Sequence, residues 1–126
     1  MKFSLEAPAQ VNLIRGYATG EVRIGTGIYR RSLIVAARTL ITDWPVSDVT
    51  RLDPAEFSAI QNLAPAVVLL GTGERQIFPD PRLFAHFSSL GIGLEVMDNG
   101  AACRTYNVLI SEGRHAVCAL ILPAPA

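Results

Sequence analysis

Three charged residues and one short loop carry groups that could bind a ligand. Glu95 and Asp98 supply carboxylates, Arg104 supplies a guanidinium, and the loop at 71–73 could bring backbone amides close to an anion. No second acid stands at a spacing that would complete a catalytic pair. We therefore assign no catalytic residue, and the candidate ligand-binding residues are Gly71, Thr72, Gly73, Glu95, Asp98 and Arg104.

The glycine-flanked loop fits two interpretations. It is neither the GxxxxGK[ST] phosphate loop nor the GxGxxG dinucleotide loop, because Gly73 is followed by the sequence ERQI. A short loop after a buried strand needs a permissive backbone whether or not anything binds there. A simple turn and an anion-binding turn both stay open.

Asp98 and Glu95 also have structural interpretations. Asp98 precedes a predicted helix, where its carboxylate would cap backbone amides and would repel an incoming anion. Glu95 lies inside the apolar run 92–97. It either faces a pocket or lies at an exposed strand edge, where it could pair with an arginine, because an unpaired buried carboxylate is costly.

Arg104 is the candidate that folding explains least. It recurs with Asn107 and Ser111 at spacings of three and four, which predicts a polar, solvent-exposed stripe on a helix. The alternative is that Arg104 clamps a carboxylate of a ligand or partner with two hydrogen bonds.

The cysteines and histidines indicate no metal site. Cys103 and Cys118 form no CxxC motif, and His86 and His115 stand alone. Cys103 is predicted to be a small core residue rather than a reactive thiol, since it lies too deep in its helix for the full pKa-lowering effect of the N-terminus. Two cysteines in a chain able to build a core fit a reducing compartment, so we predict a cytoplasmic protein.

The second half of the chain alternates strands and helices that would position the candidates. Capping residues at 53, 80 and 98 and glycines at 91 and 113 predict where helices begin and end. The predicted order is helix 54–63, strand 66–70, helix 81–90, strand 92–97, a helix from 98 to about 112, and strand 115–122. Such units form parallel strand pairs through right-handed crossovers, and ligands commonly bind at the carboxyl ends of those strands.

The first half predicts antiparallel hairpins. Apolar runs alternate with turn signals and give three strands, at 11–17, 21–24 and 32–37, with Tyr29 and Trp44 as aromatic cover for the sheet. The fold class is therefore α/β with a mixed sheet, α+β being the near alternative. Nothing indicates a repeat or a second domain, so residues 1–126 are predicted to form a single domain.

Composition excludes several classes of partner. Eleven basic and eleven acidic residues cancel, which argues against a nucleic-acid partner. The longest apolar runs fall well short of the roughly 20 residues that a membrane-spanning helix needs. Residues 1–10 lack the features of a signal or transit peptide. The expected partner is protein, with no direct membrane insertion, while the oligomeric state stays open.

The chain resembles a widespread family of small domains of unknown function. That family includes the mitochondrial assembly factor for respiratory complex I and an adipogenesis-associated domain protein. The resemblance runs through most of the chain, and its residues are Tyr29, 32–35, Trp44, 69–73, 91–93, 95–98, 101–107 and 112–114. Asn99-Gly100 departs from the family pattern, as does Arg104, where the mitochondrial branch carries a small residue.

The resemblance implies a three-layer fold, a bacterial-type member, no agreed catalytic residues and no cofactor. For the mitochondrial branch it implies protein assembly through protein contacts rather than turnover. We therefore favour a non-enzymatic interaction or assembly module. The alternative is a protein that binds a small molecule or an anion, an enzyme included, at the carboxyl ends of the strands.

Overall fold

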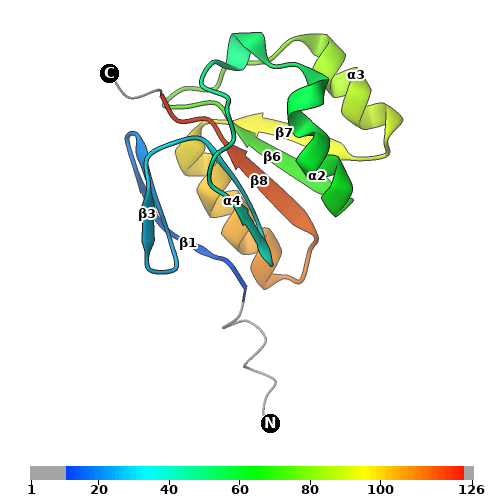
Figure 1. Ribbon diagram of the computed structural model, residues 1–126. Coiled ribbons are helices and arrows are strands. Elements are labelled where there is room, and N and C mark those ends of the chain that lie inside the picture. Colours follow the sequence, from blue (N-terminus) through cyan, green and yellow to red (C-terminus); the bar gives the residue numbers. More distant parts are fainter. Residues whose placement is uncertain (1–10, 124–126) are drawn as a thin grey trace.

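The computed structural model describes residues 11–123 (Figure 1). The segment 1–10, whose sequence argued against a signal or transit peptide, lies outside the described residues. The strands are β1 (Ile14–Ala18), β2 (Glu21–Ile24), β3 (Gly27–Tyr29), β4 (Leu33–Ala36), β5 (Thr39–Ile41), β6 (Val67–Gly71), β7 (Gly93–Met97) and β8 (Ala116–Leu120). The helices are η1 (Val49–Arg51), η2 (Pro54–Phe57), α2 (Ser58–Leu63), α3 (Pro81–Ser89) and α4 (Asn99–Ser111).

The strands form two sheets. A five-stranded sheet has the order β5-β4-β8-β6-β7, in which β6 is parallel to β7 and β8 while β4 is antiparallel to β8 and β5. An antiparallel sheet of β1, β2 and β3 lies beside it. The predicted α/β class with a mixed sheet is confirmed. The last of the described strands, β8, follows a crossover through α4 and lies in the middle of the larger sheet.

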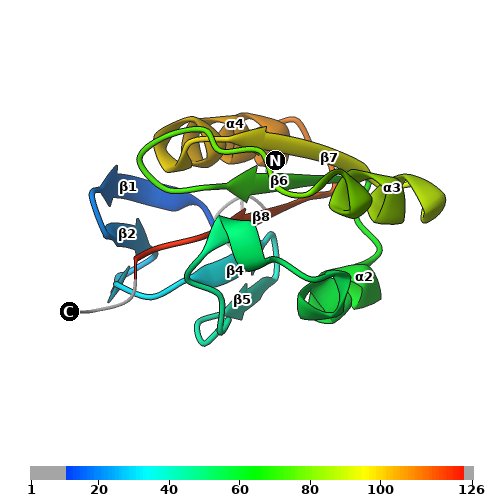
Figure 2. The same cartoon turned by 90° about the horizontal axis from the view of Figure 1, so that it is seen from above.

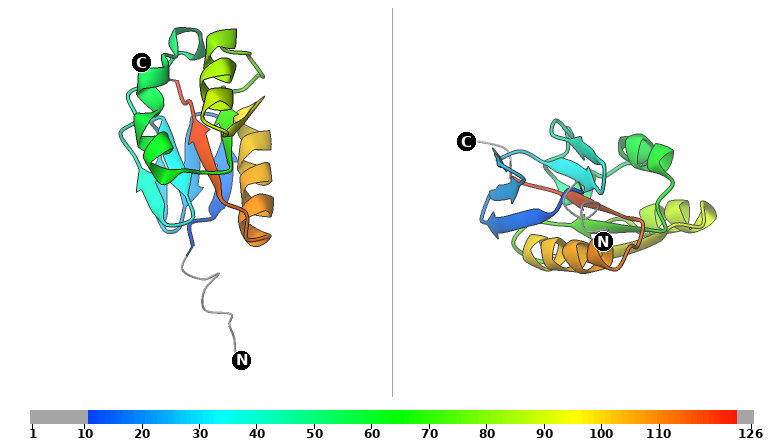
Figure 3. Two further views of the ribbon diagram at one scale, coloured as in Figure 1. Left: turned by 90° about the vertical axis from the view of Figure 1, so that its right-hand side faces the viewer. Right: turned by 90° about the horizontal axis from the view of Figure 1, so that it is seen from below.

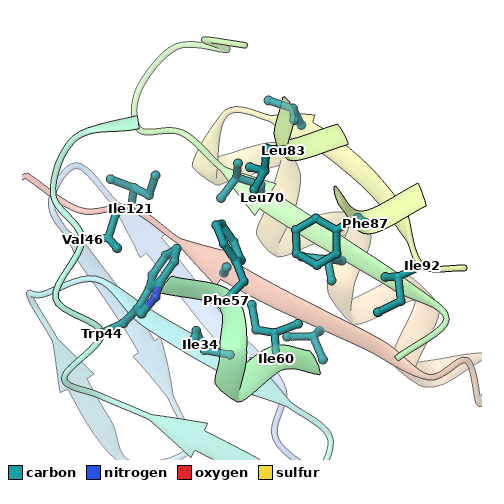
Figure 4. Close-up of a cluster of buried hydrophobic side chains, with 14 of the residues drawn as sticks. Ile34, Trp44, Val46, Phe57, Ile60, Leu70, Leu83, Phe87, Ile92 and Ile121 are labelled. Carbon is teal, nitrogen blue, oxygen red and sulfur yellow. The ribbon is translucent and has the colours of Figure 1, made fainter. Parts of the chain in front are cut away.

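One face of the five-stranded sheet is covered by η1, η2, α2 and α3. Alternate residues of the buried strands point to this face, as a two-residue period requires. The apolar side chains between this face and the helices form one buried cluster. Figure 4 shows its aromatic part, where Phe57 lies between Trp44 and Phe87. The ring centroids are 5.4 Å apart for Trp44 and Phe57 and 5.2 Å for Phe57 and Phe87, both edge-on.

The opposite face is covered by α4 and the three-stranded sheet. Figures 2 and 3 show α4 on one side of the sheet and α2 on the other. Tyr106 is completely buried on this second face, with Leu69, Cys118 and Leu120 of the sheet in the same cluster. The protein thus has three layers and two apolar clusters that share the central strands.

In the first half, the part of the chain from residue 11 on contains five strands rather than the three predicted from the sequence. β3 was missed because it is very short and begins at the last glycine of a turn. β5 was missed because the tight turn at 37–38 between β4 and β5 contains neither glycine nor proline. The last strand is shorter than predicted, and the predicted helix 54–63 starts with the 3₁₀ turn η2 before continuing as α2.

Candidate functional site

The carboxyl ends of the three parallel strands meet at one edge, where the predicted loop lies. The Thr72 amide donates to the Met97 carbonyl at 3.0 Å, and the Ile121 amide donates to the Gly71 carbonyl at 2.9 Å. The Asn99 amide, at the start of α4, donates to the Gly73 carbonyl at 2.8 Å. These bonds extend the pairing of β6, β7 and β8 beyond the strands themselves.

Asn99 is the central side chain of this edge, and it is completely buried. Its Oδ1 accepts a hydrogen bond from the Gly73 amide at 3.1 Å. Its Nδ2 donates to the Ile121 carbonyl at 2.9 Å and to the Tyr17 hydroxyl at 3.1 Å. One side chain therefore ties the loop after β6, the end of β8 and the smaller sheet together.

Gly71 allows α4 to begin this close to β6. A Cβ at Gly71 would collide with Asn99 Oδ1, would lie 2.7 Å from Leu120 Cδ2 and would crowd the Cβ of Ala102 at 3.3 Å. The absence of a side chain at this position is a packing requirement of the strand-to-helix contact. This explains the glycine without a ligand.

Tyr17 links the same edge to the loop. Its hydroxyl donates to Glu74 Oε2, and Thr19 Oγ1 donates to the other oxygen of that carboxylate at 3.1 Å. Burial, together with the hydrogen bond to the Glu74 carboxylate, raises the pKa of Tyr17 to about 12. Tyr17 is therefore a neutral donor at physiological pH.

The predicted site residues fall into three groups. Gly71, Thr72, Gly73 and Asp98 come together at the strand ends. Asp98 caps α4 by accepting from the Ala101 amide at 2.9 Å, as its position in the sequence indicated. Glu95 is exposed on the edge strand β7, and Arg104 is exposed on α4.

The polar groups of the loop are used by the protein itself. The amides of Thr72 and Gly73 donate to Met97 and Asn99, as described above. The Thr72 hydroxyl donates to the Arg75 carbonyl at 2.6 Å and accepts from the Ile77 amide at 3.0 Å. An anion at this loop would have to displace these bonds.

A groove lies beside Arg104, near the start of α4. It lies between β1 and α4, has a volume of about 330 Å³ and is partly open to solvent. Its lining includes Arg15, Tyr17, Gly100, Cys103, Arg104 and Asn107. It brings Arg104 near β1 rather than near Gly71, Thr72 and Gly73, which do not line it.

Asn107 does not lie on a free solvent-exposed stripe as predicted. Its side-chain amide accepts from the Ile14 amide at 2.9 Å and donates to the Ile14 carbonyl at 2.7 Å, so it pairs with β1 as a neighbouring strand would. The prediction failed because the helical period shows which residues share a face but not which element packs against its margin.

The two thiols are buried and free. Burial raises the pKa of Cys103 to about 12, although the nearby Arg104 opposes that shift, and burial raises the pKa of Cys118 as well. Neither is activated as a nucleophile, which agrees with their predicted core role. Within residues 11–123, no group of three or more His, Cys, Asp or Glu side chains could hold a metal ion.

Sequence reasoning missed Asn99, Tyr17, Glu74 and Arg15. Asn99 was visible only as a departure from the family pattern after Asp98. Its burial and its bonds to Gly73 and Ile121 become visible only in the structure. Tyr17, Glu74 and Arg15 are brought to this region by contacts between segments that are distant in sequence. No local sequence pattern predicts such contacts.

Comparison with known proteins gives relatives of two kinds. The chain is 27% identical over 119 residues to the "13 kDa major membrane protein" of Francisella tularensis, covering 93% of this chain and 94% of that protein. It is 34% identical over 85 residues to the Xenopus tropicalis "NADH dehydrogenase [ubiquinone] 1 alpha subcomplex assembly factor 3". That match covers 66% of this chain but only 46% of the assembly factor.

A solved structure has the same fold. The NMR structure of a Xanthomonas campestris protein superposes with a TM-score of 0.83 at 42% identity, covering 97% of this chain and 92% of that one. In the described part of the chain, no helix is both long and apolar enough to span a bilayer.

A family model described as "Protein of unknown function (DUF498/DUF598)" matches residues 14–121, which run from the first strand to just beyond the last. The chain belongs to this family, some of whose members are named as assembly factors.

Proposed function

We propose that this protein is a non-enzymatic interaction or assembly module whose partner is another protein. The observation that carries the proposal is the use of the polar groups at the strand ends, where an α/β protein commonly binds its ligand. The side chains of Asn99, Tyr17 and Thr72 form hydrogen bonds within the protein that join the two sheets and the loop. The names of the assembly-factor relatives support the same conclusion.

The accompanying proposals concern location and partners. Two free, buried thiols suit a reducing compartment, so a cytoplasmic location is part of the proposal. The balanced charge favours a protein over nucleic acid. We also propose that residues 1–126 act as one domain, without direct insertion into a membrane.

Affinity capture from a native lysate tests this function. The tagged chain should recover one protein reproducibly at mild salt, and the two should co-elute from a sizing column. The control is an unrelated domain of similar size with the same tag. If repeated captures, with and without cross-linking, enrich nothing beyond that control, the interaction module is refuted.

A second candidate function rests on the groove beside Arg104. It is a small-molecule or anion-binding protein, and of its candidate residues Gly71, Thr72, Gly73, Glu95, Asp98 and Arg104 it is Arg104 that lines this groove. The groove of about 330 Å³ favours it, because Arg104 and Arg15 both line that space. A thermal-shift screen of anions, nucleotides and metabolites should give a stabilising hit that Arg104→Ala abolishes. A screen without a hit would exclude this form of the hypothesis.

A further inference from the structure

The groove between β1 and α4 shares one lining residue with a second hollow. Arg15 lines both spaces, and the second one also contains Arg23 and Ile28, around the turn between β2 and β3. Ile28 is 47% exposed, and Val108, one helical turn after Arg104, is 53% exposed. Ile28 lines the second hollow, whereas Val108 is exposed on α4 outside the lining of either space.

A β-bulge places Arg15 in the groove. The register of β1 and β2 shifts between Ile14 and Gly16, so Arg15 is the extra residue without a partner in β2. Bulges of this kind turn a side chain away from its regular position. The two bonds between Asn107 and Ile14 hold the bulged part of β1 against α4.

The start of α4 directs Arg104 toward the same groove. Helical side chains lean toward the N-terminus of their helix, and Arg104 Nη1 lies 3.3 Å from the point that a Cβ on Gly100 would occupy. The missing side chain at Gly100 therefore leaves room for the guanidinium over the first turn. Asp98 caps the same turn with its carboxylate.

Six arginines of the described chain form no ion pair within residues 11–123, and of these Arg15 and Arg104 line the groove. Within residues 11–123, Arg51 and Arg82 each form an ion pair with a nearby aspartate, and Arg23 shares Glu21 with Arg30. Arg15 and Arg104 take part in none of those ion pairs. Their guanidinium groups are therefore available to carboxylates from outside.

We propose that this groove receives an extended, acidic segment of a partner protein. Arg15 and Arg104 bind carboxylates of that segment through charge-assisted hydrogen bonds, while the exposed Ile28 contacts an apolar side chain. The inference rests on the proposed interaction function and names the partner's chemistry. The shape favours a peptide over a lipid surface, because Arg15 and Arg104 line a concave space rather than a flat face.

The test is a titration of isotope-labelled protein with a blocked hexaglutamate peptide, followed by NMR. Shifts are expected first at β1 and at the start of α4, and they should weaken with added salt. The double variant Arg15→Ala/Arg104→Ala should bind about tenfold more weakly, from two partly screened charge pairs. The double variant Arg51→Ala/Arg82→Ala has the same net charge and should bind within about twofold of the natural chain.

Several results would overturn the inference. Equal weakening in both double variants would show a response to net charge alone. If a hexaglutamine peptide bound as tightly as the hexaglutamate peptide, carboxylates would not be what the groove recognises. Preferential binding to anionic phosphatidylglycerol vesicles or to inorganic phosphate would identify a different ligand. Unchanged spectra and melting temperatures of the variants must accompany each comparison, so that loss of fold is recognised.

Lysate capture with the same variants separates this inference from the proposed function. A protein recovered equally by the natural chain and by Arg15→Ala/Arg104→Ala would support the interaction module and refute the groove as its docking site. Peptide binding that depends on both arginines, without any captured protein, would support the groove and count against the module. If Arg15→Ala/Arg104→Ala fails to recover the protein that the natural chain and Arg51→Ala/Arg82→Ala recover, the result supports both the interaction module and the groove as its docking site.

Discussion

Replacement of Asn99 by alanine should destabilise the protein more than the small change in side-chain volume suggests. Asn99→Ala leaves the Gly73 amide and the Ile121 carbonyl without their partner in a buried place. An unsatisfied buried group costs about 1 to 3 kcal/mol, and a water molecule entering the vacated space would keep the cost near the lower end. We expect a loss of about 2 to 4 kcal/mol in the free energy of unfolding.

Urea unfolding at neutral pH measures this loss. The single tryptophan, Trp44, is buried against Phe57 and provides a fluorescence signal, while circular dichroism reports on the helices. In a domain of this size each kcal/mol also lowers the melting temperature by about 3 to 6 °C. The control is Asn62→Ala at an exposed position of α2, where the expected change is within about 0.5 kcal/mol.

Asn99→Asp tests the hydrogen-bond directions separately from side-chain size. The carboxylate still accepts from Gly73, but the oxygen that replaces Nδ2 cannot donate to Ile121. Burial raises the pKa of the introduced carboxyl, so the penalty is present above its ordinary value near pH 4 and disappears below it. Relative to the natural chain, this variant should therefore be least stable at pH 7 and should recover toward pH 3.

The reasoning about Asn99 has a clear point of failure. A loss below about 1 kcal/mol for Asn99→Ala would show that the bonds at the strand ends contribute little. A pH-independent effect of Asn99→Asp would show that the side chain is accessible to solvent.

The remaining expectations concern packing, pH and thiol chemistry. Gly71→Ala should lower the free energy of unfolding, measured in urea, by about 2 kcal/mol or more, because its Cβ would collide with Asn99 and Leu120. The control is Gly93→Ala, whose Cβ would meet Val67 at 3.6 Å and which should change that free energy by no more than about 0.5 kcal/mol. Burial raises the pKa of both Tyr17 and Cys103 to about 12, so the unfolded chain releases these protons at lower pH than the folded chain does. The urea midpoint should therefore fall as the pH rises from 9 to 11. A constant midpoint would contradict the burial of these groups. Cys103 and Cys118 should resist iodoacetamide at pH 8 until denaturant is added, as mass spectrometry would show, and rapid labelling of either thiol in the native state would contradict the structure.

Local signals in the sequence predicted much of the second half of the fold. Asp80 and Asp98 cap α3 and α4 as predicted, because a helix N-terminus depends on neighbouring residues. The continuous apolar run that became β6 identified a strand buried on both faces. The first half was harder, because β3 and β5 are three residues long and carry no period.

The candidate site depended on contacts that no local pattern encodes. Asn99 and Tyr17 are 82 positions apart, and Asn107 and Ile14 are 93 apart, yet both pairs are hydrogen-bonded. Arg104 could be selected from the sequence because its charge was unexplained. Its neighbour Arg15 could not, since a register shift between two strands brings it there.

The position of β8 has a consequence for how the chain acquires its structure. β4 and β6 touch β8 on either side, so the strand that joins the two halves of the sheet leaves the ribosome after the other described strands. Until then β4–β5 and β6–β7 are separate pairs with apolar edges exposed. Folding should therefore follow synthesis of residues 116–120 rather than keep pace with translation, and long-range pairing of this kind is slow. A nascent chain stalled before β8 should be protease-sensitive and a substrate for chaperones.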